Sequence, residues 1–242
     1  MMNSAPFKKN NNCTLCPVNQ DCLCRPFDEN ELNAALSFKK EERQYKKNEI
    51  IFKNDSKLNE VMTIVSGWTI EYKLMPDGKR SIFNISIPGD FVGFHPEKDF
   101  LSISALSAVT DVKVCVYDKE ALENFVKKHP KMASRLIRML SYEVNKLSNF
   151  LTSVSRLSSK FRLLYFIQSL GMRINKCSYL DLLEKNIDIP LTHEQIADCL
   201  GITTVHLSRT FKELKNNNIL QTSKGSYKFK ILNEVDSQIV NS

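Results

Sequence analysis

The sequence predicts an α+β protein in which a β-roll is followed by one long helix and then by a smaller helical unit that ends in a β-hairpin. Three observations support this order. Residues 49–116 are rich in Ile, Val, Phe and Thr, in short runs separated by turn signals, which is typical of a β-sandwich or roll. Residues 131–157 contain neither Pro nor Gly. Residues 190–228 combine helix-capping signals with glycine turns.

These patterns divide the chain into four parts. The expected boundaries are a Cys-rich leader at 1–28, the β-roll domain at 29–128, the long helix at 129–158 and the C-terminal unit at 159–242.

The composition is that of a globular chain. Of the 242 residues, 42% are hydrophobic and 25% are charged, which excludes a disordered or low-complexity protein. The net charge is +7, and much of the excess lies between His206 and Lys230, where six basic residues accompany one acid, Glu213. Such a basic segment favours a polyanion partner, either nucleic acid or an anionic membrane.

The sequence contains no recognisable membrane-spanning or secretory segment. No window approaches the roughly 18 consecutive apolar residues that a spanning helix needs. The polar stretch from Met1 to Asn12 is not followed by the apolar region of a signal peptide. We therefore expect a cytoplasmic protein without a membrane partner, in which the seven cysteines do not form a disulfide framework.

Turn signals divide the β-rich stretch into short strands. They lie at Asn54-Asp55, Ser66-Gly67, Pro76-Asp77-Gly78 and Pro88-Gly89-Asp90. The Asp77-Gly78 pair predicts a hairpin with a type I′ turn, because both residues tolerate a positive φ. Before the roll, the spacing of Leu32, Ala35 and Leu36 predicts a helix over 29–43.

The long helix carries a narrow apolar seam. Its apolar positions are separated by 3, 4, 3, 4 and 3 residues, which is a heptad register; they are Ile137, Leu140, Val144, Leu147, Leu151 and Val154. A strict 3.5-residue period is narrower than the stripe of an ordinary core-facing helix. The seam therefore favours a homodimer interface, with burial against the β domain of the same chain as the alternative.

The C-terminal unit begins with a helix and continues with a helix-turn-helix pattern. Ser158-Ser159 is a capping pair, and Gly171 is expected to end the helix that starts near Phe161. Thr192 and Gln195 fit a capping box, which opens a helix with an apolar side of Ile196, Ala197 and Leu200. Gly201 supplies the turn. A second helix is expected from about Thr203 to Asn216, with inward positions at Val205, Leu207, Phe211 and Leu214.

This second helix is the expected DNA-reading element. Arg209 can donate two hydrogen bonds to guanine in the major groove, and Lys212 lies where phosphates would be met. The residues expected to contact DNA are Thr203, Thr204, Val205, His206, Ser208, Arg209 and Lys212. Residues 222–228 contain a glycine turn between β-prone pieces, which predicts a basic wing. The alternative is a helical hairpin with a solvated basic face, although cap, turn, spacing and wing would then coincide by chance.

On these motifs, the chain resembles the cyclic-AMP receptor / fumarate–nitrate reduction regulator (CRP/FNR) family over nearly its whole length. The matching pieces are Val65-Ser66-Gly67, Pro88-Gly89-Asp90, the heptad helix, the segment Leu191 to Thr203 and the pair Ser208-Arg209. The resemblance implies a cyclic-nucleotide-binding-like β-roll and a winged helix-turn-helix. It also implies a homodimeric transcription activator that binds palindromic DNA near promoters, with RNA polymerase as a partner. The four histidines are scattered and no nucleophile or phosphate-loop motif occurs, so we expect no enzyme.

The resemblance also bears on the signal. The cyclic-nucleotide branch holds phosphate with an Arg followed by Ser or Thr after the Gly-Asp turn. Here the loop from Phe91 to Ala105 has no Arg, and Lys98 stands between Glu97 and Asp99. This argues against cyclic AMP as the ligand.

The cysteines indicate a metal site. Cys13, Cys16 and Cys22 have the spacing C-x2-C-x5-C, and closely spaced thiolates can hold an iron–sulfur cluster. Three local ligands leave a fourth to come from elsewhere. Cys115, in an apolar strand 93 residues after Cys22, resembles the fourth ligand of the oxygen-sensing branch. The implied cofactor is a [4Fe–4S] cluster.

Spacing alone leaves alternatives open. A structural Zn(Cys)4 site or a thiol redox switch fits the same residues, and Cys24 can substitute for Cys22. No role is assigned to Cys177, which is expected in a loop, or to Cys199, which is expected in the helix-turn-helix core.

The resemblance implies that the cluster forms in low oxygen, promotes dimerisation and DNA binding, and is dismantled by oxidants. A regulator of the same fold that senses nitric oxide, a haem-bound gas or thiol oxidation is the alternative. One departure is Val205, because the oxygen-sensing branch usually has Glu there. Valine cannot accept a hydrogen bond from cytosine, so the half-site preference is open while a contact from Arg209 to guanine is still expected.

Overall fold

The computed structural model describes residues 17–18, 39–94, 101–178, 180–183 and 185–230. The chain divides into two compact units, Met1–Tyr142 and Glu143–Ser242. The predicted α+β class is confirmed, because a strand-rich unit precedes a mainly helical unit that carries a small sheet.

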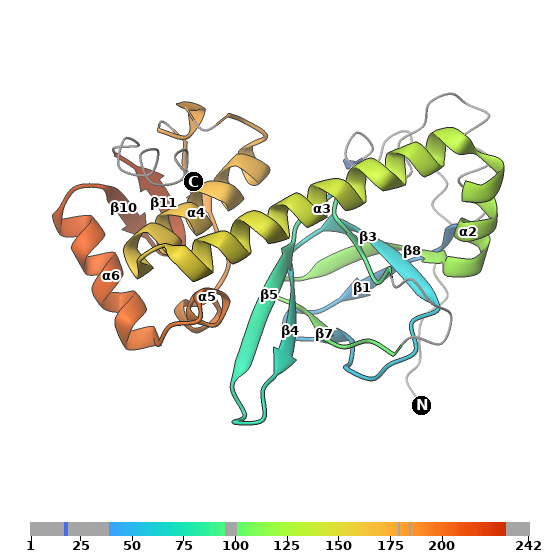
Figure 1. Ribbon diagram of the computed structural model, residues 1–242, viewed down its shortest axis with the longest axis horizontal. Helices are drawn as coiled ribbons and strands as arrows, with labels where there is room; N and C mark the ends of the chain where they lie inside the picture. The colour runs from blue at the N-terminus through green and yellow to red at the C-terminus, as the bar shows by residue number, and fades with distance from the viewer. Residues whose placement is uncertain (1–16, 19–38, 95–100, 179, 184, 231–242) are drawn as a thin grey trace. The chain divides into compact units, whose positions relative to one another are not determined.

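Two four-stranded antiparallel sheets form the first unit (Figure 1). Their strands are β1 (Lys39–Tyr45), β2 (Ile50–Phe52), β3 (Glu60–Ser66), β4 (Thr69–Leu74), β5 (Arg80–Ser86), β6 (Phe91–Val92), β7 (Ala105–Ala108) and β8 (Val112–Asp118). One sheet has the order β1-β8-β3-β6 and the other has the order β2-β7-β4-β5. The β-rich character predicted for residues 49–116 is therefore confirmed.

The main core of this unit lies between the two sheets. Ile64 of β3, Val114 of β8 and Leu106 of β7 are fully buried there in one hydrophobic cluster. Along β3 and β8 these side chains alternate with residues that point to the opposite face. That outer face carries a second cluster, against which α2 (Lys119–Lys128) and the first part of α3 (Pro130–Arg156) pack. Outward-pointing residues of β3 and β8 are therefore buried as well.

Strand β1 contradicts part of the helix expected over 29–43. Lys39–Tyr45 pairs antiparallel with β8, so the prediction is wrong for residues 39–43, whereas residues 29–38 lie outside the described part of the chain. The periodic apolar residues Leu32, Ala35 and Leu36 all precede β1. Without β1, one edge of β8 would leave its backbone groups unpaired, and satisfying them outweighs a weak local helical preference.

The hairpin predicted at Asp77-Gly78 joins β4 to β5, but its turn is not type I′. Gly78 has a φ of +79°, whereas Asp77 is not among the residues with positive φ. Met75 accepts a hydrogen bond from Gly78 N–H at 2.9 Å and donates its own N–H to the Lys79 carbonyl at 2.8 Å. This is a three-residue loop closed by a left-handed glycine. Pro76 explains the difference, because its fixed φ favours the first central position of a type I turn.

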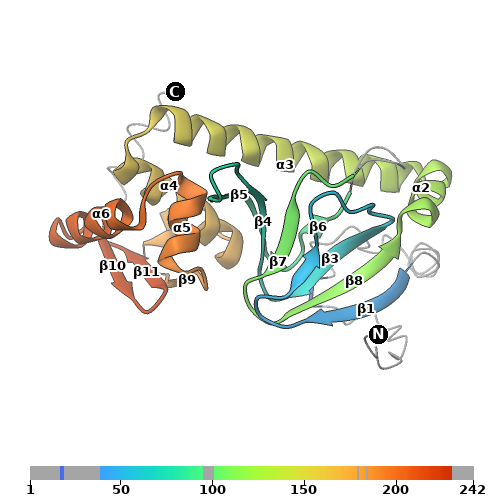
Figure 2. The ribbon, with the colours of Figure 1, turned by 90° about the horizontal axis from the view of Figure 1, so that it is seen from below.

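The second unit packs helices against a small sheet (Figure 2). Its elements after α3 are α4 (Ser159–Asn175), the 3-10 turn η2 (Leu180–Leu182), β9 (Ile187–Asp188), α5 (His193–Leu200), α6 (Thr204–Asn216), β10 (Leu220–Ser223) and β11 (Ser226–Phe229). The sheet order is β10-β11-β9, with antiparallel pairing.

Helix α4 continues past the glycine that was expected to end it. Gly171 lies inside the helix, and the residue at the C-terminal cap is Lys176, in the left-handed conformation. A Cβ atom at Gly171 would lie 2.7 Å from Cδ1 of Ile187 on β9. The glycine therefore permits close packing of helix on strand, and the prediction of a helix end there is wrong.

Candidate functional site

Helix α5 (His193–Leu200), capped by Thr192 and Gly201, is the first helix of the predicted pair. The Thr192 hydroxyl accepts a hydrogen bond from Gln195 N–H at 3.1 Å, and the Gln195 side chain accepts one from Thr192 N–H at 2.9 Å. This is the predicted capping box, which satisfies two backbone donors at the start of α5. Gly201 ends α5 with a φ of +64°, as the turn requires. The local sequence therefore determines both ends of this helix.

Helix α6 buries one face and exposes the other. The Thr203 hydroxyl caps its start by accepting from His206 N–H at 3.2 Å. Leu207, Phe211 and Leu214 are buried as predicted, and Thr210, the other buried residue of α6, follows the same 3.6-residue period. Val205 is 60% exposed, so its expected inward position is wrong. It lies about 200° around the helix from Leu207, on the outward side.

The outward face carries every residue expected to contact DNA. All of them are exposed: Thr203, Thr204, Val205, His206, Ser208, Arg209 and Lys212. The Ser208 hydroxyl donates to the Thr204 carbonyl at 2.9 Å, and the Thr203 hydroxyl is engaged as the cap. Two of the short polar side chains therefore serve the helix itself. The longer His206, Arg209 and Lys212 side chains extend from the same face and suit contacts with bases and phosphates.

An aromatic stack holds the two helices and the hairpin together. The ring of Phe211 on α6 stacks on His193 of α5 at 5.2 Å and on Tyr227 of β11 at 5.7 Å between centroids. The hairpin β10–β11 turns at Lys224 and Gly225, both with positive φ. The predicted wing is thus present and is fixed to α6 through ring contacts worth about 0.5–1.5 kcal/mol each.

Arg162 is a structural residue that sequence reasoning missed. From α4, its guanidinium donates to the Leu200 carbonyl at 2.8 Å and to the Val154 carbonyl at 2.7 Å. It therefore joins the last residue of α5 to the C-terminal turn of α3, where unpaired carbonyls are otherwise left over. No local signal marks it, because the three segments meet only in the folded unit.

Cys115, the expected fourth metal ligand, lies on the outer face of the β1-β8-β3-β6 sheet. It is 5% exposed and belongs to a cluster with Val61 and Tyr117 from the sheet and Leu122 and Phe125 from α2. Figure 1 shows α2 beside the end of β8. Cys115 is thus placed in an apolar site rather than on an open strand edge.

Val18 belongs to the same cluster and is also 5% exposed. In sequence it lies between Cys16 and Cys22, two of the three closely spaced cysteines. Cys13, Cys16, Cys22 and Cys24 themselves lie outside the described residues. Among the residues that are described, no group of three or more His, Cys, Asp or Glu side chains is arranged to hold a metal ion.

The remaining two cysteines take the expected positions. Cys199 is buried in α5 among the apolar residues of the helix-turn-helix. Cys177 follows the end of α4, outside any helix or strand.

A charged group borders the Cys115 site. Glu42 on β1 is the register partner of Cys115, and its carboxylate pairs with Lys39 at 2.9 Å and Lys113 at 2.6 Å. Burial would raise the pKa of the Glu42 carboxyl, but the hydrogen bonds from the two lysines outweigh it and the net pKa is lowered. The Glu42 carboxylate is thus held in its charged form beside Cys115 by two lysines.

The seam of α3 lies open in the single chain. Five of its six side chains are between 41% and 68% exposed, and these are Ile137, Leu140, Val144, Leu147 and Leu151. Val154 is half-buried. These large apolar side chains are therefore exposed at the positions where the heptad register predicts a seam.

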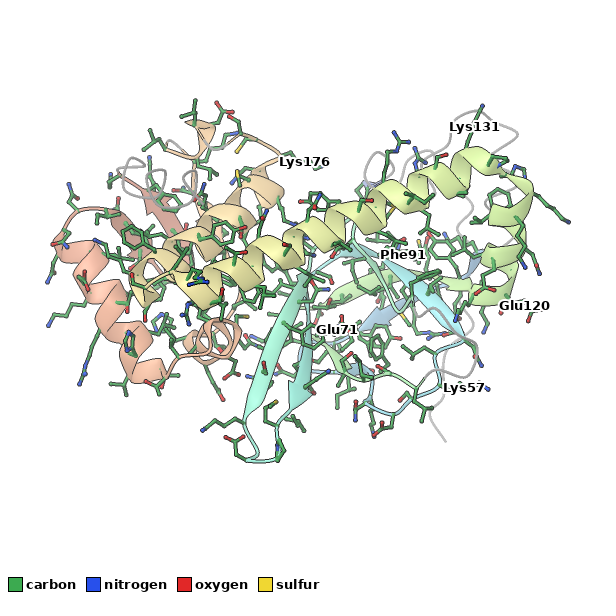
Figure 3. The ribbon with its side chains drawn as sticks, viewed as in Figure 1. Lys57, Glu71, Phe91, Glu120, Lys131 and Lys176 are labelled. Carbon is green, nitrogen blue, oxygen red and sulfur yellow. The ribbon has the colours of Figure 1, made fainter. Side chains whose placement is uncertain are left out.

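The described part of the loop after β6 does not suit a phosphate. Ser102 and Ser104 are fully buried, and the Ser104 hydroxyl donates to the Glu71 carboxylate at 2.5 Å. Glu71, labelled in Figure 3, belongs to β4. An acidic side chain bonded to this loop would repel an anionic phosphate.

Two family models match these units. The model described as a cyclic nucleotide-binding domain matches residues 42–129, and a Crp-like helix-turn-helix domain matches residues 161–235. The transcriptional activator protein FnrL of Cereibacter sphaeroides is 27% identical over 86% of this chain and 83% of its own length. The chain belongs to the CRP/FNR family of transcription regulators. It is a DNA-binding regulator and not an enzyme, and the predicted family is confirmed.

Other CRP/FNR members show comparable similarity. The nitrogen fixation regulation protein FixK of Bradyrhizobium diazoefficiens is 26% identical, over 88% of this chain and 87% of its own. An anaerobic regulatory protein of Haemophilus influenzae is 24% identical, over 89% and 82% of the two chains. Their lengths are largely covered, so the match concerns whole regulators.

Solved structures agree with this CRP/FNR fold. FixK2 from Bradyrhizobium japonicum superposes with a TM-score of 0.71 at 23% identity, covering 81% of this chain and 95% of that one. A CooA mutant from Carboxydothermus hydrogenoformans gives 0.67 at 20% identity, covering 82% and 87%.

None of the helices in the described residues combines the length and the hydropathy that crossing a membrane requires.

Proposed function

We propose that this regulator responds to oxygen or a related oxidant through a [4Fe–4S] cluster bound by Cys13, Cys16, Cys22 and Cys115. The observation that carries the proposal is the burial of Val18 in the same cluster as Cys115. A chain spans at most about 3.6 Å per residue, so two residues reach about 7 Å and four reach about 14 Å. A segment anchored at Val18 is thus short enough to bring Cys16 and Cys22 to Cys115.

The residues around Cys115 fit such a group. Cysteine thiolate is the usual protein ligand of iron–sulfur clusters. The apolar surroundings of Cys115 limit the access of water to the sulfur. The relative from Haemophilus influenzae is named for anaerobic regulation, which supports a signal linked to oxygen.

When bound, the cluster would supply a metal–sulfur centre that oxidants dismantle. The chain's own part is to hold the cysteine-rich segment against the outer face of the sheet. That face also packs against Met132 and Leu136 of α3, and the seam of the same helix begins at Ile137. Ordering of this face is therefore proposed to act on the helix that carries the dimer seam.

The homodimer is part of the proposal. The seam from Ile137 to Leu151 exposes large apolar side chains at heptad spacing, and a second copy of α3 would cover them. A two-fold dimer would present two copies of α6 to a palindromic promoter site, with RNA polymerase as the partner in activation. A bias of a few kcal/mol from the metal site would suffice to switch a marginal dimer.

Purification without oxygen, followed by iron and acid-labile sulfide analysis, tests the proposal. We expect about four iron and four sulfide per chain, and a larger dimer fraction before exposure to air than after it. A colourless protein with one zinc and no iron would instead assign the four cysteines to a structural Zn(Cys)4 site. A protein without metal whose thiols oxidise reversibly would make it a thiol switch. Iron retained as haem would indicate a gas sensor.

A further inference from the structure

Thr63 has a buried hydroxyl with no hydrogen-bond partner among the described residues, and it lies directly across from Cys115. The residue is 1% exposed, and its Oγ1 makes no hydrogen bond with any residue that the structure describes. In the pairing of β3 with β8, Thr63 is the register partner of Cys115. Buried hydroxyls are nearly always satisfied, because an unmet one costs free energy. This exception therefore calls for a physical reason.

Register places Thr63 and Cys115 in one row across the sheet. The row runs from Glu42 on β1 through Cys115 and Thr63 to Phe91 on β6. Residues that face each other in antiparallel strands point to the same side, so all four share the outer face. Phe91, labelled in Figure 3, packs against the cluster of Cys115 and Val18, in agreement with this placement.

The spacing in this row allows a hydrogen bond. Opposed side chains in antiparallel strands have Cβ atoms about 4.5–5.5 Å apart. That separation leaves room for a hydroxyl to donate to a sulfur on the neighbouring strand. A metal-bound cysteine is a thiolate, which is a charged acceptor and stronger than a thiol.

A second buried threonine shows that a hydroxyl without a partner does not by itself indicate a contact with a metal ligand. Thr69 on β4 is fully buried, and its Oγ1 also has no partner among the described residues. Its register partners are Ser86 and Ala108, in the other sheet, and neither is a cysteine. What distinguishes Thr63 is its position opposite the candidate ligand.

We infer that the Thr63 hydroxyl donates a hydrogen bond to the metal-bound thiolate of Cys115, an inference that rests on the metal site proposed above. Hydrogen bonds to cluster sulfurs stabilise the more negative, reduced form and so raise the reduction potential. Thr63 is thus a positioning residue that tunes the sensitivity of the site to oxidants. Metal binding also supplies the acceptor that the buried hydroxyl otherwise lacks.

Three variants of the full-length, anaerobically loaded protein test the inference. Thr63→Val removes the hydroxyl and keeps the shape, Thr63→Ser keeps the hydroxyl, and Thr69→Val is the matched control. For Thr63→Val we expect the one-electron reduction equilibrium to become roughly tenfold less favourable, which is about 59 mV. Loss of the cluster absorbance in air should be correspondingly faster. Thr63→Ser and Thr69→Val should stay close to the unaltered protein.

The metal-free protein provides an independent readout. There, the Thr63 hydroxyl has no partner to lose, so Thr63→Val should unfold at the same temperature as the unaltered chain or higher. A clear fall in unfolding temperature would mean that the hydroxyl is already bonded, which contradicts the inference.

The outcomes separate this inference from the proposed function. If the unaltered protein binds the cluster while Thr63→Val and Thr69→Val have the same potential, only the role of Thr63 is wrong. If the unaltered protein binds zinc, the cluster proposal is wrong, and competition with a chelator tests Thr63, with faster release expected from Thr63→Val. If the unaltered protein binds no metal, both are wrong.

Discussion

Helix α6, which we propose reads DNA, and the Cys115 site are built in opposite ways. In α6, the residues expected to contact DNA lie within 203–212, on the exposed face of one helix. At Cys115, buried neighbours come from β3, β8, α2, α3 and the segment around Val18, which is 97 positions earlier in the chain. The first arrangement is local and faces solvent, whereas the second depends on contacts between distant segments. Changes on the exposed face of α6 should therefore alter only the binding of DNA. Changes at Cys115 should alter whether the first unit can hold a metal group.

The largest expected effect is that of Cys115→Ala. Because Cys13, Cys16 and Cys22 supply only three of the four thiolates in the proposed site, the variant should retain almost no cluster after anaerobic purification, measured as iron and sulfide per chain. The second unit should keep its fold. Cys199→Ala is the matched control, since Cys199 is 6% exposed against 5% for Cys115 and lies in α5. Equal iron in the two variants would remove Cys115 from the site.

The next effect concerns the seam. Leu147→Glu places an unpaired charge where a second copy of α3 is proposed to pack, so the dimer dissociation constant should rise at least 100-fold. Analytical ultracentrifugation measures it. Asn149→Glu is the control, because Asn149 is exposed and lies about 200° around the helix from Leu147. A dimer that tolerates Leu147→Glu but not Asn149→Glu would place the interface on another face.

A smaller effect is expected on α6. Arg209→Ala should cost about 1–3 kcal/mol of DNA binding and relax the preference at one base pair. Lys212→Ala, one turn away, should weaken binding to all DNA sequences alike. It should also reduce the slope of log binding constant against log salt concentration by about one. Binding titrations on a set of half-site variants at several salt concentrations separate the two. An unchanged base preference in Arg209→Ala would contradict its assignment.

The smallest effect is a pH dependence of the first unit. Glu60 on β3 accepts from Lys40 at 2.6 Å and from Arg43 at 3.0 Å. Burial would raise the pKa of the Glu60 carboxyl, but these hydrogen bonds outweigh it and lower the net pKa. A lowered pKa in the folded state means that the unfolded chain binds protons more readily. The stabilisation is therefore complete above the pKa of the unfolded carboxyl, near 4.5, and is lost as the pH falls through the lower folded value.

Urea unfolding of the metal-free protein at pH 7 and at steps below pH 4.5 measures this dependence. Glu60→Gln should flatten it, since the amide does not titrate. Asp77→Asn is a suitable control, because the pKa of Asp77 is also lowered but its carboxylate is exposed at the hairpin turn. If the free energy of unfolding of Glu60→Gln falls with pH as steeply as that of the unaltered chain, the Lys40–Glu60–Arg43 group is not the source of the pH dependence.

The sequence anticipated most of the second unit because its signals are local. A capping box needs two side chains three residues apart, and Thr192 with Gln195 forms it as expected. The two wrong predictions for this unit have one cause. Gly171 looked like a helix end, yet contact with Ile187 on β9 explains it, and Val205 looked inward although α6 turns it outward. The environments of Gly171 and Val205 both depend on which element packs against the helix. A short window of sequence does not contain that information.

By itself, the sequence determined the α+β class, the strand-rich roll, the heptad helix and the helix-turn-helix with its wing. These follow from periodicity, caps and turns, whose physics acts within a few residues. Only the tertiary structure decided that Lys39–Tyr45 is a strand, because the free edge of β8 requires a partner. It alone decided that Arg162 joins α3 to α5, and that Thr63 stands opposite Cys115. Register between strands distant in sequence is set by the burial of both sheet faces, and this is a property of the whole fold.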